Sequence, residues 1–124
     1  MIYLDTNVLI RIITGDVPTV ANKILAQIDA SAKGTYFIHD AVFVELCFVL
    51  EFHDYAMPRH AIAEALVTLQ ASPQVVISNE SMHALQLYKK YPKLDYADCL
   101  LFVLGGEVGV LTLDKEFIKT LLKS

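Results

Sequence analysis

Short apolar segments alternate along the chain with longer segments in which apolar residues recur at helical spacing. The short segments are rich in β-branched or aromatic residues and are bounded by polar residues or glycine, a pattern typical of strands. The predicted strands are Met1–Leu4, Tyr36–Ile38, Val75–Ile77 and Val110–Leu113. Because these segments are apolar throughout, we expect strands that are covered on both faces of a parallel sheet.

The longer segments predict helices, since their apolar residues fall on one helical face. The first two stripes are Val20, Ile24, Leu25 and Ile28, and then Ile62, Leu66 and Leu69 after Pro58. The last two are Met82, Leu85 and Tyr88, ending by Pro92, and then Phe117, Ile118, Leu121 and Leu122. Strands that alternate with helices imply parallel pairing through crossover connections. The pattern therefore predicts an α/β fold, a three-layer α/β/α sandwich around a central, mostly parallel sheet.

The length of 124 residues suits one domain, which we expect to span residues 1–124. Hydrophobic residues make up 55% of the chain and charged residues 19%, which indicates a surface for an oligomer or a partner protein. No segment is apolar and long enough to predict a membrane span, and the first residues lack the basic region of a signal peptide. Cys47 and Cys99 lie in apolar segments, as packing residues of a reducing compartment do, so a cytoplasmic location is predicted.

Two acidic residues directly follow predicted strands. Asp5 comes after the first strand, and Asp114 comes after the last. The carboxyl ends of parallel strands form the ligand crevice of such sheets, so topology places both acids at one edge. The alternative is that each is the N-cap of the helix that follows it.

Glu45 is the one charged residue in the apolar segment Ala41–Leu50. A carboxylate on an apolar helix face is costly to desolvate unless a cation or hydrogen-bond donors meet it. We therefore expect a buried Glu45 beside a cation. The alternatives are a buried ion pair with Arg or Lys, and a helix face that emerges at the surface.

Asp95 and Asp98 are three residues apart at the predicted start of a helix, and so share one face. Asp95 is predicted to be the N-cap, and the helix dipole favours Asp98 in the first turn. Because apolar residues follow Asp98 at once, we expect it to face inward and to serve the site as well.

Four carboxylates that converge raise one another's pKa, and a hard divalent cation relieves this repulsion. The chemistry favours Mg²⁺ or Mn²⁺, one or two ions per site. The histidines and cysteines are scattered, which disfavours zinc, and we find no glycine-rich phosphate loop and no GxSxG nucleophile motif. The net charge of −4 would repel RNA, but two bound divalent cations would bring it to zero.

In this order and spacing, the motifs resemble those of the PIN-domain ribonucleases, and most closely the VapC-type toxins of toxin–antitoxin pairs. The opening Met1–Arg11 resembles the family's first strand and turn, and Glu45 matches its second acid. Leu94–Leu100 matches the third motif, with Asp98 as principal ligand, and Leu111–Phe117 matches the fourth. The resemblance implies a parallel sheet, dependence on Mg²⁺ or Mn²⁺, and endonucleolytic cleavage of RNA. It also implies a homodimer, and inhibition by a cognate antitoxin whose tail occupies the active-site groove.

The candidate catalytic residues and metal ligands are Asp5, Glu45, Asp98 and Asp114, which would hold the ions that activate water. The candidate accessory residues are Thr6, Asn7, Asp95 and Thr112. The hydroxyls could orient carboxylates, and Asn7 could contact substrate or cap a helix. The candidate contacts to RNA phosphate or to an antitoxin carboxylate are Arg11, Lys93 and Lys115. The neighbouring lysines Lys89, Lys90, Lys119 and Lys123 could extend a basic rim, or form an ordinary solvated face.

Three other functions fit parts of the pattern. An RNA-processing PIN nuclease would lack the antitoxin, and a non-catalytic PIN-like module would bind RNA or protein without cutting. A phosphoacceptor receiver domain expects adjacent acids after its first strand and an acceptor aspartate after a central one. Thr6 and Asn7 follow Asp5 here, and Ser78 and Asn79 follow the third predicted strand, which disfavours the receiver.

Overall fold

The structure is a computed structural model that describes residues 1–106 and 108–122. The chain forms two compact units, Met1–Ser78 and Asn79–Ser124. The first unit contains the sheet, and the second is helical where it is regular.

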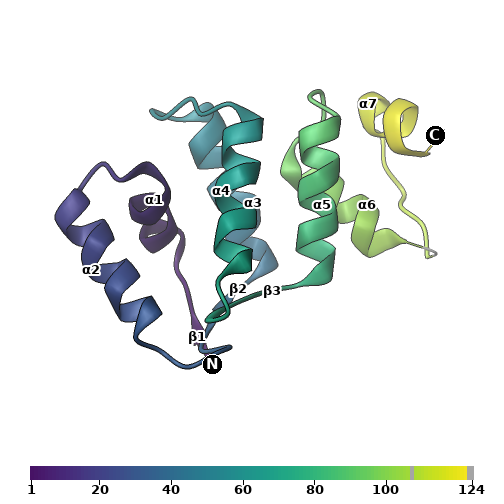
Figure 1. Cartoon of the computed structure of the whole chain (residues 1–124). Coiled ribbons are helices and arrows are strands. Elements are labelled where there is room, and N and C mark those ends of the chain that lie inside the picture. Colours follow the sequence, from purple (N-terminus) through teal and green to yellow (C-terminus); the bar gives the residue numbers. More distant parts are fainter. Residues whose placement is uncertain (107, 123–124) are drawn as a thin grey trace. The chain divides into compact units, whose positions relative to one another are not determined.

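Three parallel strands form the sheet of the first unit, in the order β1-β2-β3 (Figure 1). They are β1 (Ile2–Tyr3), β2 (Tyr36–Ile38) and β3 (Val75–Ile77), which confirms the first three predicted strands. Ile2 is paired with Tyr36, and Tyr36 with Val75. Parallel strands need long crossovers, and two helices supply each one. These are α1 (Thr6–Thr14) and α2 (Pro18–Asp29), and then α3 (Asp40–Phe52) and α4 (Arg59–Ala71).

One side of the sheet in the first unit is buried more completely than the other. The alternate strand residues Tyr36, Ile38 and Val75 are buried, whereas Phe37 and Val76 between them are only half-buried. The two faces of β2 and β3 are therefore covered to different degrees, although neither is fully exposed. Short strands of β-branched residues are apolar on both sides, so the sequence pattern does not tell which side is better packed.

The second unit contains α5 (Asn79–Lys90), α6 (Tyr96–Gly105) and α7 (Lys115–Phe117), followed by a π-helical turn at Ile118–Leu122 (Figure 1). Helix α5 packs on α6, where the rings of Tyr88 and Tyr96 meet edge to face with centroids 5.9 Å apart. The rings of Phe102 and Phe117 pack in the same manner at 6.4 Å. Helices α5 and α6 confirm the helix predicted to end by Pro92 and the helix predicted to start at Asp95. The last predicted helix, Phe117–Leu122, is formed by the end of α7 and the π-helical turn.

The fourth predicted strand, Val110–Leu113, is not a strand in the structure. Its leucines are almost completely exposed, Leu111 at 100% and Leu113 at 96%. A strand needs a neighbour for its backbone groups, and the pairing found within the described residues joins β1, β2 and β3 alone. Gly105 shapes the start of this segment, because a Cβ there would overlap the side chain of Val110.

Parallel strands joined by helices confirm the predicted α/β class, and the mostly helical arrangement agrees with an α/β/α fold. Cys47 and Cys99 are both buried and are not joined in a disulfide, as expected of packing residues. None of the helices that the structure describes is long and apolar enough to cross a membrane.

Candidate functional site

Asp5 lies in the short connection between the end of β1 and the start of α1. Its backbone is extended and its Oδ1 accepts a hydrogen bond of 2.9 Å from the Thr6 amide, so it is the N-cap of α1. The aspartate is exposed, Thr6 is buried and Asn7 is exposed. The alternative interpretation of Asp5 as an N-cap is therefore confirmed. The position of the cap also places a carboxylate at the carboxyl end of a parallel strand.

Glu45 lies in the middle of α3, but it is exposed, so the expectation of a buried carboxylate is wrong. The buried face of α3 consists of Phe43, Leu46, Cys47 and Leu50. The exposed face carries Ala41, Glu45, Phe48 and Phe52 at helical spacing, and the two phenylalanines are 53% and 57% exposed. The sequence pattern did not reveal that this face is at the surface, because the exposed residues beside Glu45 are themselves aromatic. The physical argument from desolvation therefore does not require a cation at Glu45.

Two aspartates of the second unit, Asp95 and Asp114, act on a third, Asp98. Asp95 is the N-cap of α6, and its Oδ1 accepts a hydrogen bond of 2.8 Å from the Asp98 amide. Burial and the negative charges of Asp95 and Asp114 raise the pKa of Asp98 from 3.8 to about 6. The structure thus brings together three acids that the sequence pattern singled out.

Asp114 is the N-cap of α7, and its Oδ1 accepts a hydrogen bond of 2.9 Å from the Phe117 amide. The hydroxyl of Thr112 accepts a hydrogen bond of 3.1 Å from the Asp114 amide. Thr112 therefore holds the backbone of Asp114, which is a different role from the predicted contact with a carboxylate.

The chemistry of these donors fits a hard divalent cation. All four candidate ligands are carboxylates. The pKa of Asp98 is raised first by burial and then by the charges of Asp95 and Asp114, and a bound cation would offset these effects. Asp5 and Glu45 belong to the first unit, and Asp98 and Asp114 belong to the second. Within the described residues, no group of three or more His, Cys, Asp or Glu side chains is arranged as a ready metal-binding cluster.

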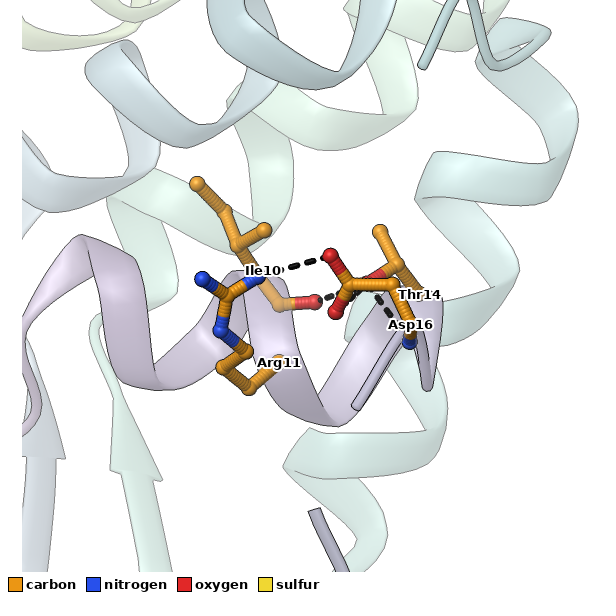
Figure 2. Close-up of polar contacts among 4 residues, drawn as sticks. All are labelled: Ile10, Arg11, Thr14 and Asp16. Carbon is orange, nitrogen blue, oxygen red and sulfur yellow. Dashed lines mark hydrogen bonds and ion pairs between the residues drawn. The ribbon is translucent and has the colours of Figure 1, made fainter. Parts of the chain in front are cut away.

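Arg11 is engaged at the end of its own helix, as Figure 2 shows. Its Nη1 lies 2.7 Å from Oδ2 of Asp16, and the Thr14 hydroxyl lies 2.9 Å from Oδ1. Burial raises the pKa of Asp16, but the hydrogen bonds from Thr14 and Arg11 and the guanidinium charge outweigh it and hold the pKa below its usual value. Gly15 ends the helix in the left-handed conformation that brings Asp16 back to Arg11. A phosphate or a partner's carboxylate would have to share Arg11 with Asp16.

The candidate lysines are solvent-exposed. Lys93 and Lys115 are exposed, and the Lys90 ammonium lies 5.2 Å from the ring centroid of Tyr91. Lys123 lies outside the described residues. The predicted basic rim is therefore compatible with an ordinary solvated face.

Two side-chain hydrogen bonds were not predicted from the sequence. The Ser78 hydroxyl, just after β3, donates to Asp40 Oδ1 at 2.7 Å and so ties that strand end to the start of α3. The Tyr96 hydroxyl donates to the Ser81 carbonyl at 3.1 Å. A tyrosine in an apolar helix is the signal for the second contact, since a buried hydroxyl needs a partner.

A pair of variants tests the cap at Asp95. Asp95→Ser keeps a capping oxygen and Asp95→Ala does not, while both remove the same negative charge beside Asp98. The serine variant should be more stable by about 1 kcal/mol, measured as the free energy of unfolding in urea. Equal stability of the two variants would show that the side chain does not cap α6.

Comparison with known proteins gives one family. A model of the PIN domain family matches residues 2–120. The chain has no match among curated proteins and none among solved structures.

Proposed function

Because the chain belongs to the PIN domain family, whose members are generally nucleases, we propose that it is a metal-dependent endoribonuclease. The matched residues span both compact units, which supports one nuclease domain over residues 1–124. The observation that supports metal dependence is the group of neighbouring acids around the start of α6. The Asp95 carboxylate accepts a hydrogen bond of 2.8 Å from the Asp98 amide, and burial together with the charges of Asp95 and Asp114 raises the pKa of Asp98 to about 6.

We assign Asp5, Glu45, Asp98 and Asp114 as the residues that would hold one or two Mg²⁺ or Mn²⁺ ions. When bound, such an ion supplies a water of lowered pKa and positive charge beside the scissile phosphate. Asp5 and Asp114 each accept a hydrogen bond from a helix amide through Oδ1, which orients the carboxylate. Asp98 would enter the site as the ionised form, because cation binding displaces its proton.

The remaining candidates have supporting roles in this proposal. Thr112 holds the backbone of Asp114, and Asp95 holds that of Asp98. Thr6 and Asn7 follow Asp5 in the first turn of α1 and would help to fix its carboxylate. Arg11, Lys93 and Lys115 would contact RNA phosphate or the acidic tail of an antitoxin.

We further propose that this nuclease is the toxin of a toxin–antitoxin pair. It would be a cytoplasmic homodimer that a cognate antitoxin inhibits. Exposed aromatic side chains support a protein partner: the rings of Phe48 and Phe52 on α3 lie 5.4 Å apart, and both are more than half exposed. A neighbouring small gene should encode a DNA-binding protein that co-purifies with the chain and stops RNA cleavage. Without such a gene, a processing nuclease that acts alone is the better interpretation.

Cleavage of end-labelled RNA by the purified chain tests the function. Cutting should occur with Mg²⁺ or Mn²⁺, stop with EDTA and resume when the cation is restored, because the ions activate the water. DNA of the same sequence is the control for substrate class. Cleavage that continues in EDTA would contradict metal dependence, and intact RNA under all conditions would favour a non-catalytic module.

A further inference from the structure

Tyr96 is a buried side chain that joins the start of α6 to α5. The residue is only 2% exposed, its hydroxyl donates to the Ser81 carbonyl at 3.1 Å, and its ring packs edge to face on Tyr88. A hydrogen bond has a direction that apolar packing lacks, so this contact fixes where the first residue of α6 lies along α5.

Tyr96 stands between two of the acids already described. Asp95 before it is exposed and caps the helix, and Asp98 after it is half-buried in the same first turn. The Asp95 carboxylate holds the Asp98 amide at 2.8 Å, so the three residues form one hydrogen-bonded turn. Neither acid is anchored by deep burial of its own, and a shift of the turn would move both carboxylates.

We propose that Tyr96 is a positioning residue that sets the metal affinity of Asp98 by holding the first turn of α6 against α5. The inference rests on the proposed function, because it takes Asp98 as a metal ligand. Groups that orient ligands without touching the metal typically change affinity by 10- to 100-fold. Tyr96 acts through the backbone, so the lower end of this range applies.

The test compares Tyr96→Phe with Tyr88→Phe, which removes the hydroxyl from the other ring of the same pair. Calorimetry should show Mn²⁺ binding about tenfold weaker in Tyr96→Phe and nearly unchanged in Tyr88→Phe. The Mn²⁺ concentration for half-maximal RNA cleavage should rise by the same factor, while the rate at saturating Mn²⁺ stays close to that of the wild-type protein. General loosening of the fold would not shift the half-activating concentration alone.

The outcomes separate this inference from the proposed function. A wild-type protein that neither binds Mn²⁺ nor cuts RNA would refute the proposed function. A wild-type protein that does both, with Tyr96→Phe identical to it or Tyr88→Phe equally weakened, would overturn the role of Tyr96 alone. A measurement on the wild-type protein needs no variant to fold. In a protein that binds Mg²⁺, the ¹³C resonance of the Ser81 carbonyl should shift on addition of the ion, and a resonance that stays in place would overturn the role of Tyr96 alone.

Discussion

Replacement of Asp98 by Asn is expected to lower RNA cleavage by at least about 100-fold, since loss of a ligand should exceed the effect of losing a group that orients one. The same change should make the metal-free protein more stable near pH 7.5. Asparagine keeps the shape of the side chain but has no charge to be desolvated or repelled by Asp95 and Asp114. Activity and stability are therefore expected to move in opposite directions at this residue.

The expected gain in stability of Asp98→Asn follows from the pKa of Asp98, which is raised from 3.8 to about 6 in the folded protein. The protonated carboxyl favours the folded state, and this contribution is fully present below pH 3.8. It is lost as the pH rises toward and through the folded value of about 6. The whole rise would correspond to about 3 kcal/mol, but Asp98 is only partly buried, and solvent screening reduces the expected effect to about 1 kcal/mol. The helix dipole opposes it, typically by a few tenths of a kcal/mol for a surface charge.

Urea unfolding in EDTA measures this effect at pH 4 and at pH 7.5. Asp98→Asn should match the wild-type protein at pH 4 and exceed it at pH 7.5. Asp54→Asn is the matched control, because Asp54 is exposed in the loop after α3 and its removal should change little at either pH. A variant that is less stable than the wild-type protein at pH 7.5 would show that the acidic cluster does not strain the metal-free fold.

The elements that the sequence predicted well are those whose signals are local. Asp5, Asp95 and Asp114 are N-caps because a short carboxylate before a helix can reach the free amides of its first turn. The three short strands of the first unit come from runs of β-branched and aromatic residues with turn residues around them. These signals need no knowledge of the rest of the chain.

The features that the sequence did not predict depend on contacts that a local residue pattern does not show. Val110–Leu113 has the composition of a strand, but pairing is a property of two segments, and the described residues show none for it. Glu45 sits in an apolar run, yet the aromatic residues around it lie on an exposed face. The sequence pattern does not indicate the role of Asp16, because that role depends on the left-handed turn at Gly15, which places Asp16 beside Arg11. The exposure of a helix face, the pairing of a strand and the ion pair across a turn can be determined only in the folded chain.

Saturating Mn²⁺ is expected to stabilise the protein. The proposed ligands come from both compact units, so both units should be stabilised. At a concentration 100 times the dissociation constant, binding to the folded state adds about 2.7 kcal/mol to the free energy of unfolding. For a chain of this size the melting temperature should rise by about 10 °C. The rise should be smaller at pH 5 than at pH 7.5, since Asp98 must lose its proton to bind the cation.

Hydrogen exchange distinguishes a site of four carboxylates from one confined to the second unit. If Asp5, Glu45, Asp98 and Asp114 share the ions, Mn²⁺ should slow amide exchange in α3 as well as in α6, and Asp5→Asn should remove most of the thermal shift. If Asp95, Asp98 and Asp114 alone form the site, Mn²⁺ should slow amide exchange in α6 but not in α3. The Asp5→Asn variant should then show the same thermal shift as the wild-type protein. Because Glu45 is exposed and nothing in its surroundings demands a cation, the response of α3 is the measurement that decides whether it is a ligand.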